Sequence, residues 1–136
     1  MSKRVYLAAA WMRKNEMRET AFALRNWGFE VTSTWHDSHQ ENAIVSDEAM
    51  QKEAIRDYYE IQNSDILIRF ADDLTNVNDL HTARKLLTAG RMVEMGIALT
   101  AGVGVAVIGP HQCVFDYLPF VDVYPSLEAF INDYQG

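Results

Sequence analysis

The chain has 136 residues, of which 49% are hydrophobic and 23% are charged, a composition typical of one globular domain and unlike that of a disordered chain. The formal net charge of −7, with no cluster of Lys and Arg, argues against a nucleic-acid polymer as partner, because phosphate contacts need a basic face. No apolar run approaches the ~20 residues of a membrane span, and the single cysteine, Cys113, fits the reducing cytoplasm that we expect for this protein.

The first half of the chain predicts two strands and two helices. Arg4–Ala9 is typical of a buried strand, and Arg13–Trp27 carries apolar residues at helical spacing. Phe29–Thr34 alternates like a second strand, and the polar segment His36–Val45 is expected to be a loop. Ser46 is a typical N-cap for the helix that follows. One face of that helix is apolar and carries Met50, Ala54, Tyr58 and Ile61, of which the Tyr58/Ile61 stripe is expected at the core.

The second half predicts three further strands and two helices. Asp65–Phe70 is a short apolar strand, and the polar segment from Ala71 to Leu87 is expected to be a loop, with a short helical turn near its end. Gly90–Ala101 predicts a helix that leads into a strand at Val103–Ile108. A last strand and a closing helix capped by Ser126 are expected at Asp122–Tyr124 and Leu127–Tyr134.

Alternating strands and helices predict a parallel sheet with right-handed crossovers. Five such strands favour an α/β, flavodoxin-like, doubly wound sheet in the order 2-1-3-4-5, with helices on both faces. Ligands of such sheets bind beyond the carboxyl ends of the strands. No internal repeat or domain boundary is visible, so residues 1–136 are expected to form one domain with one binding crevice.

Glu94 lies near the start of the predicted helix Gly90–Ala101. We expect the helix dipole and the free N–H groups there to keep this carboxylate ionised. An ionised glutamate at the mouth of a crevice can act as a nucleophile. Acidic residues are also common in first turns only because they stabilise helices, by roughly 0.3–1 kcal/mol, so the hypothesis needs support from other parts of the chain.

Two further segments are expected at the same rim. Ala8 and Ala10 are small enough to let a ligand approach the backbone, and Trp11 offers a face on which a ring can stack. The two alanines also suit ordinary packing of a strand against a helix. Asp57 follows the apolar face of its helix, so it borders the core, where partial burial would raise its pKa.

In these motifs the chain resembles the nucleoside 2-deoxyribosyltransferases and the deoxynucleoside 5′-monophosphate N-glycosidases of the same superfamily. The resemblance covers nearly the whole chain, in order. It is carried by Val5-Tyr6-Leu7-Ala8 with Ala10-Trp11, by Asp57 followed by Asn63-Ser64-Asp65-Ile66-Leu67, and by Val93-Glu94-Met95-Gly96-Ile97-Ala98-Leu99.

The resemblance implies a role for each of three residues. Glu94 matches the family's nucleophile, Asp57 the aspartate that handles protons at the nucleobase, and Tyr6 the tyrosine that positions the nucleophilic carboxylate. The implied reaction is cleavage or transfer of an N-glycosidic bond through a glycosyl-glutamate intermediate. A neighbouring subunit often supplies a polar residue in this family, and Asp116 is in the nearest stretch. The aromatic C-terminal part of the chain also favours a homodimer or larger homo-oligomer.

Thr88 departs from the pattern of transferases that use free nucleosides, which often carry an aspartate six residues before the nucleophile. Thr88, Gly90 and Arg91 could cradle a 5′-phosphate at the helix N-terminus. Equally, Thr88 could be an N-cap and Arg91 a solvated helix residue. The choice between nucleosides and their 5′-monophosphates therefore stays open, and the choice between transfer and hydrolysis stays open with it.

The rival hypothesis is a non-catalytic module that binds a nucleotide, or a nucleotide-derived signal, in the same crevice, because one fold can host both functions. No Gly-x-Gly-x-x-Gly motif follows the first strand, so a flavin or dinucleotide carrier is disfavoured and no cofactor is expected. The four histidines share no metal-ligand spacing, and no metal is expected. Under both hypotheses the partner is a small nucleoside or nucleotide.

Overall fold

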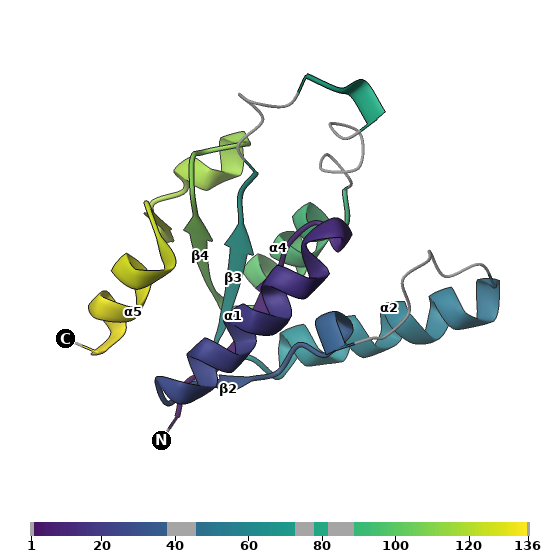
Figure 1. The fold of residues 1–136 in the computed structure, drawn as a ribbon, viewed down its shortest axis with the longest axis horizontal. Coiled ribbons are helices and arrows are strands. Elements are labelled where there is room, and N and C mark those ends of the chain that lie inside the picture. Colours follow the sequence, from purple (N-terminus) through teal and green to yellow (C-terminus); the bar gives the residue numbers. More distant parts are fainter. Residues whose placement is uncertain (1, 38–45, 73–77, 82–88, 136) are drawn as a thin grey trace.

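Five parallel strands form one sheet in the order β2-β1-β3-β4-β5, in a computed structural model that describes residues 2–37, 46–72, 78–81 and 89–135 (Figure 1). The strands are β1 Arg4–Ala8, β2 Glu30–Val31, β3 Ile66–Phe70, β4 Gly104–Ile108 and β5 Val121–Tyr124. The predicted strand order and parallel arrangement are confirmed.

In the described part of the chain, α-helices and short 3-10 helices lie between the strands, and one α-helix follows the last strand. The helices are α1 Lys14–Asn26, α2 Asp47–Gln62, α4 Gly90–Ala101 and α5 Leu127–Gln135, and the 3-10 helices are η1 Trp11–Arg13, η2 Trp35–Asp37 and η3 Val114–Tyr117. In Figure 1, α1 and α5 lie on the near side of the sheet and α4 on the far side. The sheet is therefore doubly wound, as predicted.

The register between β1 and β3 decides which of their side chains face α4. Tyr6 pairs with Leu67 and Ala8 pairs with Arg69, so these four side chains share one face of the sheet. The backbone of both strands is enclosed on both faces, because β1 and β3 lie inside the sheet and helices cover it. Tyr6 is fully buried, and its side chain reaches α4 from the middle of β1.

Strand β2 is shorter than the predicted strand Phe29–Thr34, because a bond to the Ser33 side chain takes the place of the next backbone hydrogen bond between the strands. Thr32 N–H still donates to the Val5 carbonyl at 2.8 Å. One residue further, the Ser33 hydroxyl accepts the Leu7 N–H at 3.1 Å, and the chain then turns into η2. The sequence pattern shows the alternation of this segment but not the point at which its backbone leaves the sheet.

Helix α2 begins after Ser46, whose hydroxyl accepts the Ala49 N–H at 3.1 Å, as predicted for an N-cap. The stripe expected at the core, Tyr58 and Ile61, is buried only at Ile61, and most of the apolar face of the helix lies outside the core. Ile61 is fully buried, but Met50 is 55% and Tyr58 is 43% exposed. Figure 1 shows why, since α2 runs outward from the sheet and only its C-terminal end reaches the core.

Among the described residues, no helix combines the length and apolar character needed to cross a bilayer. Most of the predicted loop Ala71–Leu87, including its expected helical turn, lies outside the described residues.

Candidate active site

A cleft of about 680 Å³ opens between α2, α4 and the residues that follow β1. This volume is within the range of small-molecule sites, roughly 300–1,000 Å³. The wall is mainly apolar, and it carries three carboxylates, Glu53 and Asp57 from α2 and Glu94 from α4. The cleft therefore brings together two of the three residues for which the sequence predicted chemistry, and the third contacts one of them directly.

That third residue is Tyr6, whose hydroxyl donates a hydrogen bond to Glu94 Oε2. Burial and the neighbouring Glu94 carboxylate raise the pKa of Tyr6 far above its ordinary value. The hydroxyl therefore keeps its proton and remains a donor. Because Tyr6 is held in β1, an interior strand of the sheet, this bond fixes one oxygen of Glu94 and leaves Oε1 for other contacts.

Glu94 is less acidic than the sequence suggested. Burial raises its pKa to about 8, and the negative charge of Asp57 acts in the same direction, although the hydrogen bond from Tyr6 opposes the shift. The prediction that the helix start keeps Glu94 ionised is wrong. Helix α4 begins at Gly90, so Glu94 is its fifth residue, beyond the free N–H groups of the first turn, and it borders an apolar cleft.

Asp57 also has a raised pKa, as the sequence predicted from its position beside the core. Burial raises the pKa of Asp57 to about 7, with a further contribution from the Glu53 carboxylate. The Arg56 guanidinium opposes this, but its Nη2 lies 3.6 Å from Asp57 Oδ1, outside hydrogen-bond distance. Near neutral pH the cleft therefore holds two carboxyl groups that are close to their titration midpoints.

Two tryptophans form an aromatic corner of the cleft. Trp11, which was predicted to contact substrate, lines it together with Trp35, and the two ring centroids are 6.0 Å apart. The Trp35 indole N–H donates to the Leu7 carbonyl at 2.7 Å, which fixes its ring. Trp35 follows the predicted strand Phe29–Thr34, and the sequence gave no reason to assign it to the wall of a cleft.

The small residues predicted to contact substrate are only partly at the cleft. Gly90 and Ala9 line it, but Ala8 and Ala10 do not, and both are almost fully buried in packing. The ordinary packing role that the sequence allowed for these two alanines is the one that the structure supports. Thr88 lies outside the described residues, so its role stays a prediction.

Arg91 lines the cleft beside Gly90, but its side chain is only 2% exposed. Its Nη2 lies 2.9 Å from Asp72 Oδ2, and Asp72 Oδ1 lies 3.1 Å from Arg13 Nη1. The interpretation of Arg91 as a solvated helix residue is therefore wrong. Two arginines share one buried carboxylate at the end of β3, and this arrangement holds Arg91 at the edge of the cleft.

Asp116 was predicted to contact substrate, but the structure gives it a structural role away from the cleft wall. It is buried in η3 and accepts two hydrogen bonds from the fully buried Arg69, at 2.6 and 2.7 Å. Burial alone would raise the pKa of Asp116, but the bonds from Arg69 and from the Gln112 N–H outweigh it and lower the pKa to about 2. The sequence did not predict that Asp116 would pair with Arg69, a buried arginine of β3.

The sequence analysis missed most of the contribution of α2 to the wall. Met50, Ala54 and Tyr58 line the cleft although the sequence placed them only on one apolar helical face, and Glu53 was not assigned at all. A signal for Glu53 was present, because it precedes Asp57 by four residues and so lies on the same helical face. Within the described part of the chain, no group of three or more His, Cys, Asp and Glu side chains could hold a metal ion.

Comparison with known proteins gives structural relatives only. No protein-family model and no curated protein sequence matches the chain. The structure resembles a 2-deoxyribosyltransferase from the psychrotolerant bacterium Bacillus psychrosaccharolyticus, with a TM-score of 0.68 and 17% identity over 98% of this chain and 90% of that one. It also resembles a CMP N-glycosidase, BcmB, from Clostridium botulinum, with a TM-score of 0.56 and 20% identity over 98% of both chains.

A conserved protein from Enterococcus faecalis V583 has the same architecture, with a TM-score of 0.59 and 13% identity over 99% of this chain and 98% of that one. These matches extend over nearly the full length of every chain compared. The protein therefore has the nucleoside 2-deoxyribosyltransferase-like fold that its sequence motifs predicted.

Proposed function

We propose that this protein is an enzyme that cleaves or transfers the N-glycosidic bond of 2′-deoxynucleosides or their 5′-monophosphates. The observation that carries the proposal is the Glu94 carboxyl group, held by the Tyr6 hydroxyl and sharing one apolar cleft with Asp57. The fold supports it, since a 2-deoxyribosyltransferase and a CMP N-glycosidase have the same architecture. Fold alone does not determine function, so the argument depends on these side chains.

In the first step, Glu94 in its ionised form attacks C1′ of the sugar. The bond from C1′ to the base nitrogen breaks, its electron pair goes to the base, and the base takes a proton from the Asp57 carboxyl group. The product is a glycosyl ester of Glu94 and a free base, as in retaining glycosidases. Tyr6 binds Oε2 of Glu94, so Oε1 is the oxygen assigned to the attack.

In the second step, water or another base attacks C1′ of the ester. The bond from C1′ to the glutamate oxygen breaks, and the Asp57 carboxylate accepts the proton released by the attacking group. Water gives hydrolysis and a second base gives transfer. The chemistry uses only carboxyl groups of this chain, and no cofactor is needed for either outcome.

The walls of the cleft suit a flat base and a sugar. Trp11 and Trp35 offer aromatic surface to the base. Gly90 and Arg91, at the start of α4, also line the cleft and supply positive charge to its edge. We assign a 5′-phosphate, where the substrate has one, to this edge.

The test is chromatographic. The protein is incubated with each deoxynucleoside and each deoxynucleoside 5′-monophosphate, with and without a second free base, and the products are separated. We expect release or exchange of a base with at least one substrate, and loss of this activity in Glu94→Gln, whereas Glu48→Gln at the exposed end of α2 is the matched control. Tight binding without any breakdown would instead support the non-catalytic nucleotide-binding module.

A further inference from the structure

Arg56 lies on α2 beside two of the carboxylates that line the cleft, and it contacts them unequally. We propose that Glu53 is a positioning residue for Asp57: it holds the Arg56 guanidinium in an ion pair and so leaves Asp57 able to carry a proton. This inference rests on the proposed function, in which Asp57 protonates the leaving base.

Glu53 and Asp57 compete for one nitrogen atom of Arg56. Arg56 Nη2 donates a hydrogen bond to Glu53 Oε1, whereas the same nitrogen lies 3.6 Å from Asp57 Oδ1. Asp57 Oδ1 has no hydrogen-bond partner among the described residues. Helix spacing explains the preference, because residues three apart lie on the same side of a helix and adjacent residues do not.

The other charged groups that the structure describes around Asp57 are carboxylates, so Arg56 decides whether Asp57 is protonated. The carboxylates of Glu53 and Glu60 on α2 raise the pKa of Asp57, and Asp57 interacts electrostatically with Glu94 on α4, whereas Tyr6 on β1 stays neutral. Arg56 is the cation that opposes them. The direction in which Arg56 points therefore controls whether Asp57 ionises, and Glu53 sets that direction.

The Glu53→Gln variant tests the proposal, because it leaves the side-chain shape but removes the charge that holds Arg56. We expect Arg56 to turn to Asp57 and to lower the pKa of Asp57 by about one unit, which is roughly a tenfold loss of the protonated form near neutral pH. Turnover near neutral pH should fall by a similar factor with KM unchanged. The acidic limb of the pH profile should move to lower pH, because Asp57 has the lower pKa of the two carboxyl groups.

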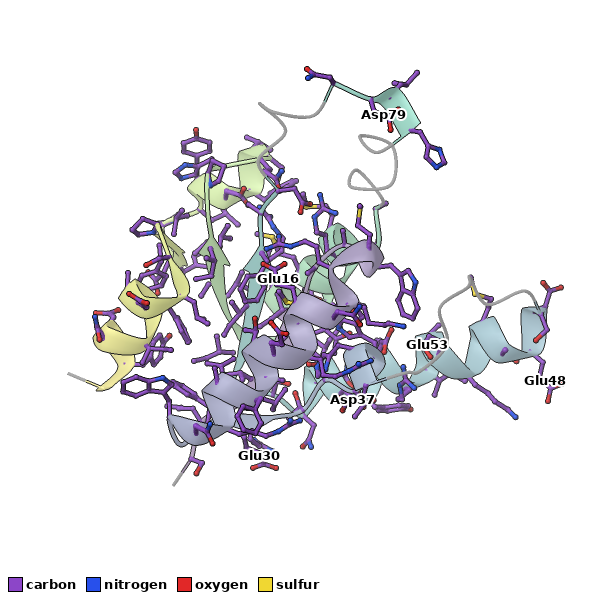
Figure 2. All side chains as sticks on the ribbon, viewed as in Figure 1. Glu16, Glu30, Asp37, Glu48, Glu53 and Asp79 are labelled. Carbon is purple, nitrogen blue, oxygen red and sulfur yellow. The ribbon has the colours of Figure 1, made fainter. Side chains whose placement is uncertain are left out.

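A second substitution distinguishes this role from a general loss of structure. In the double variant Glu53→Gln with Arg56→Gln, no guanidinium remains to ionise Asp57, so we expect the pH profile to return close to that of the unchanged protein. Glu48→Gln is the matched control, because Glu48 also pairs with a cation on α2, Lys52, at 3.6 Å. Figure 2 shows Glu48 at the outer end of α2 and Glu53 nearer the sheet.

The pKa of Asp57 can be measured without any substrate, by ¹³C NMR titration of the carboxyl groups in the full chain, with Asp57→Asn identifying the resonance. A titration that does not move in Glu53→Gln, or a double variant that is not restored, would overturn the role of Glu53. A higher KM with an unchanged pH profile would also overturn it, because Glu53 would then contact the substrate. If the titration moves as expected but no base is released from any substrate, the proposed function fails instead.

Discussion

The two carboxyl groups of the cleft define the pH range in which the proposed reaction can run. The mechanism needs one ionised and one protonated carboxyl group, and burial raises the pKa of Asp57 to about 7 and that of Glu94 to about 8. Below both pKa values both carboxyl groups are protonated, and no nucleophile is present. Above both values both groups are ionised, and no proton donor is present. The pair therefore titrates as a unit, and neither limb belongs to one residue.

We expect kcat/KM to follow a bell-shaped curve with its maximum between about pH 7 and about pH 8. The measurement is a series of initial rates from about pH 5.5 to about pH 9.5 with one substrate, and it includes a check that the fold is intact at each end. A rate that rises steadily with pH would contradict the assignment, because the reaction would then need no proton donor.

Tyr6 is the second test at the residue scale. Tyr6→Phe keeps the buried ring in β1 but removes the donor to Glu94 Oε2. Hydrogen bonds to charged groups contribute about 1.5–3 kcal/mol, so we expect kcat to fall by roughly 10- to 150-fold. The alkaline limb of the pH profile should move to higher pH, because the pKa of Glu94 is the higher of the two and rises when the hydrogen bond from Tyr6 is removed. Circular dichroism checks the fold, and an unchanged rate would remove Tyr6 from the mechanism.

At the scale of elements, η2 carries Trp35 into the cleft wall and depends on a buried histidine. His36 is fully buried, and its Nε2 lies 2.9 Å from the Ser33 hydroxyl that also accepts the Leu7 N–H. Burial lowers the pKa of His36 below its ordinary value. His36 begins the polar segment that was expected to be a loop, yet its side chain is buried.

The lowered pKa makes η2 sensitive to acid. Below about pH 6.5 the unfolded chain takes up a proton at His36 before the folded chain does, so the free energy of unfolding falls as the pH drops through this window. We expect His36→Gln to weaken the loss of thermal stability between about pH 7 and about pH 5. The difference between the two proteins isolates His36, because the carboxyl groups of the cleft titrate in both. Parallel melting curves over this range would contradict the prediction.

The elements also show which features a sequence can reveal. Strand order could be predicted because strands and helices alternate along the chain. Helix ends could be predicted because caps such as Ser46 depend only on nearby residues. The apolar face of α2 was also visible, but periodicity cannot tell whether such a face meets a core or an open cleft. The pKa of Glu94 was misjudged for the same reason. A helix start can be recognised from nearby residues, but the burial of Glu94 depends on how α2, α4 and β1 pack together.

At the scale of the whole molecule, a large amount of apolar surface is left uncovered. Helix α2 exposes Met50, Ile55, Tyr58 and Tyr59, and the segment around η3 exposes Val114, Phe115, Tyr117 and Phe120. Contiguous exposed apolar patches in a monomer mark places where another molecule binds. Helix α2 runs outward from the sheet, and η3 lies in the connection between β4 and β5.

We expect the protein to form a homodimer or larger homo-oligomer that covers at least one of these patches. Sedimentation velocity should give a mass that is a multiple of 15.5 kDa. Tyr59, which is 63% exposed and does not line the cleft, tests α2, and Phe115, at 58%, tests η3. A charge in the covered patch, in Tyr59→Glu or in Phe115→Glu, should shift the protein toward monomer, because burying that carboxylate costs more than the lost apolar contact alone. Phe22→Glu on α1, where the ring is 66% exposed, is the control. A monomer at every concentration would show that neither patch joins two copies of the chain.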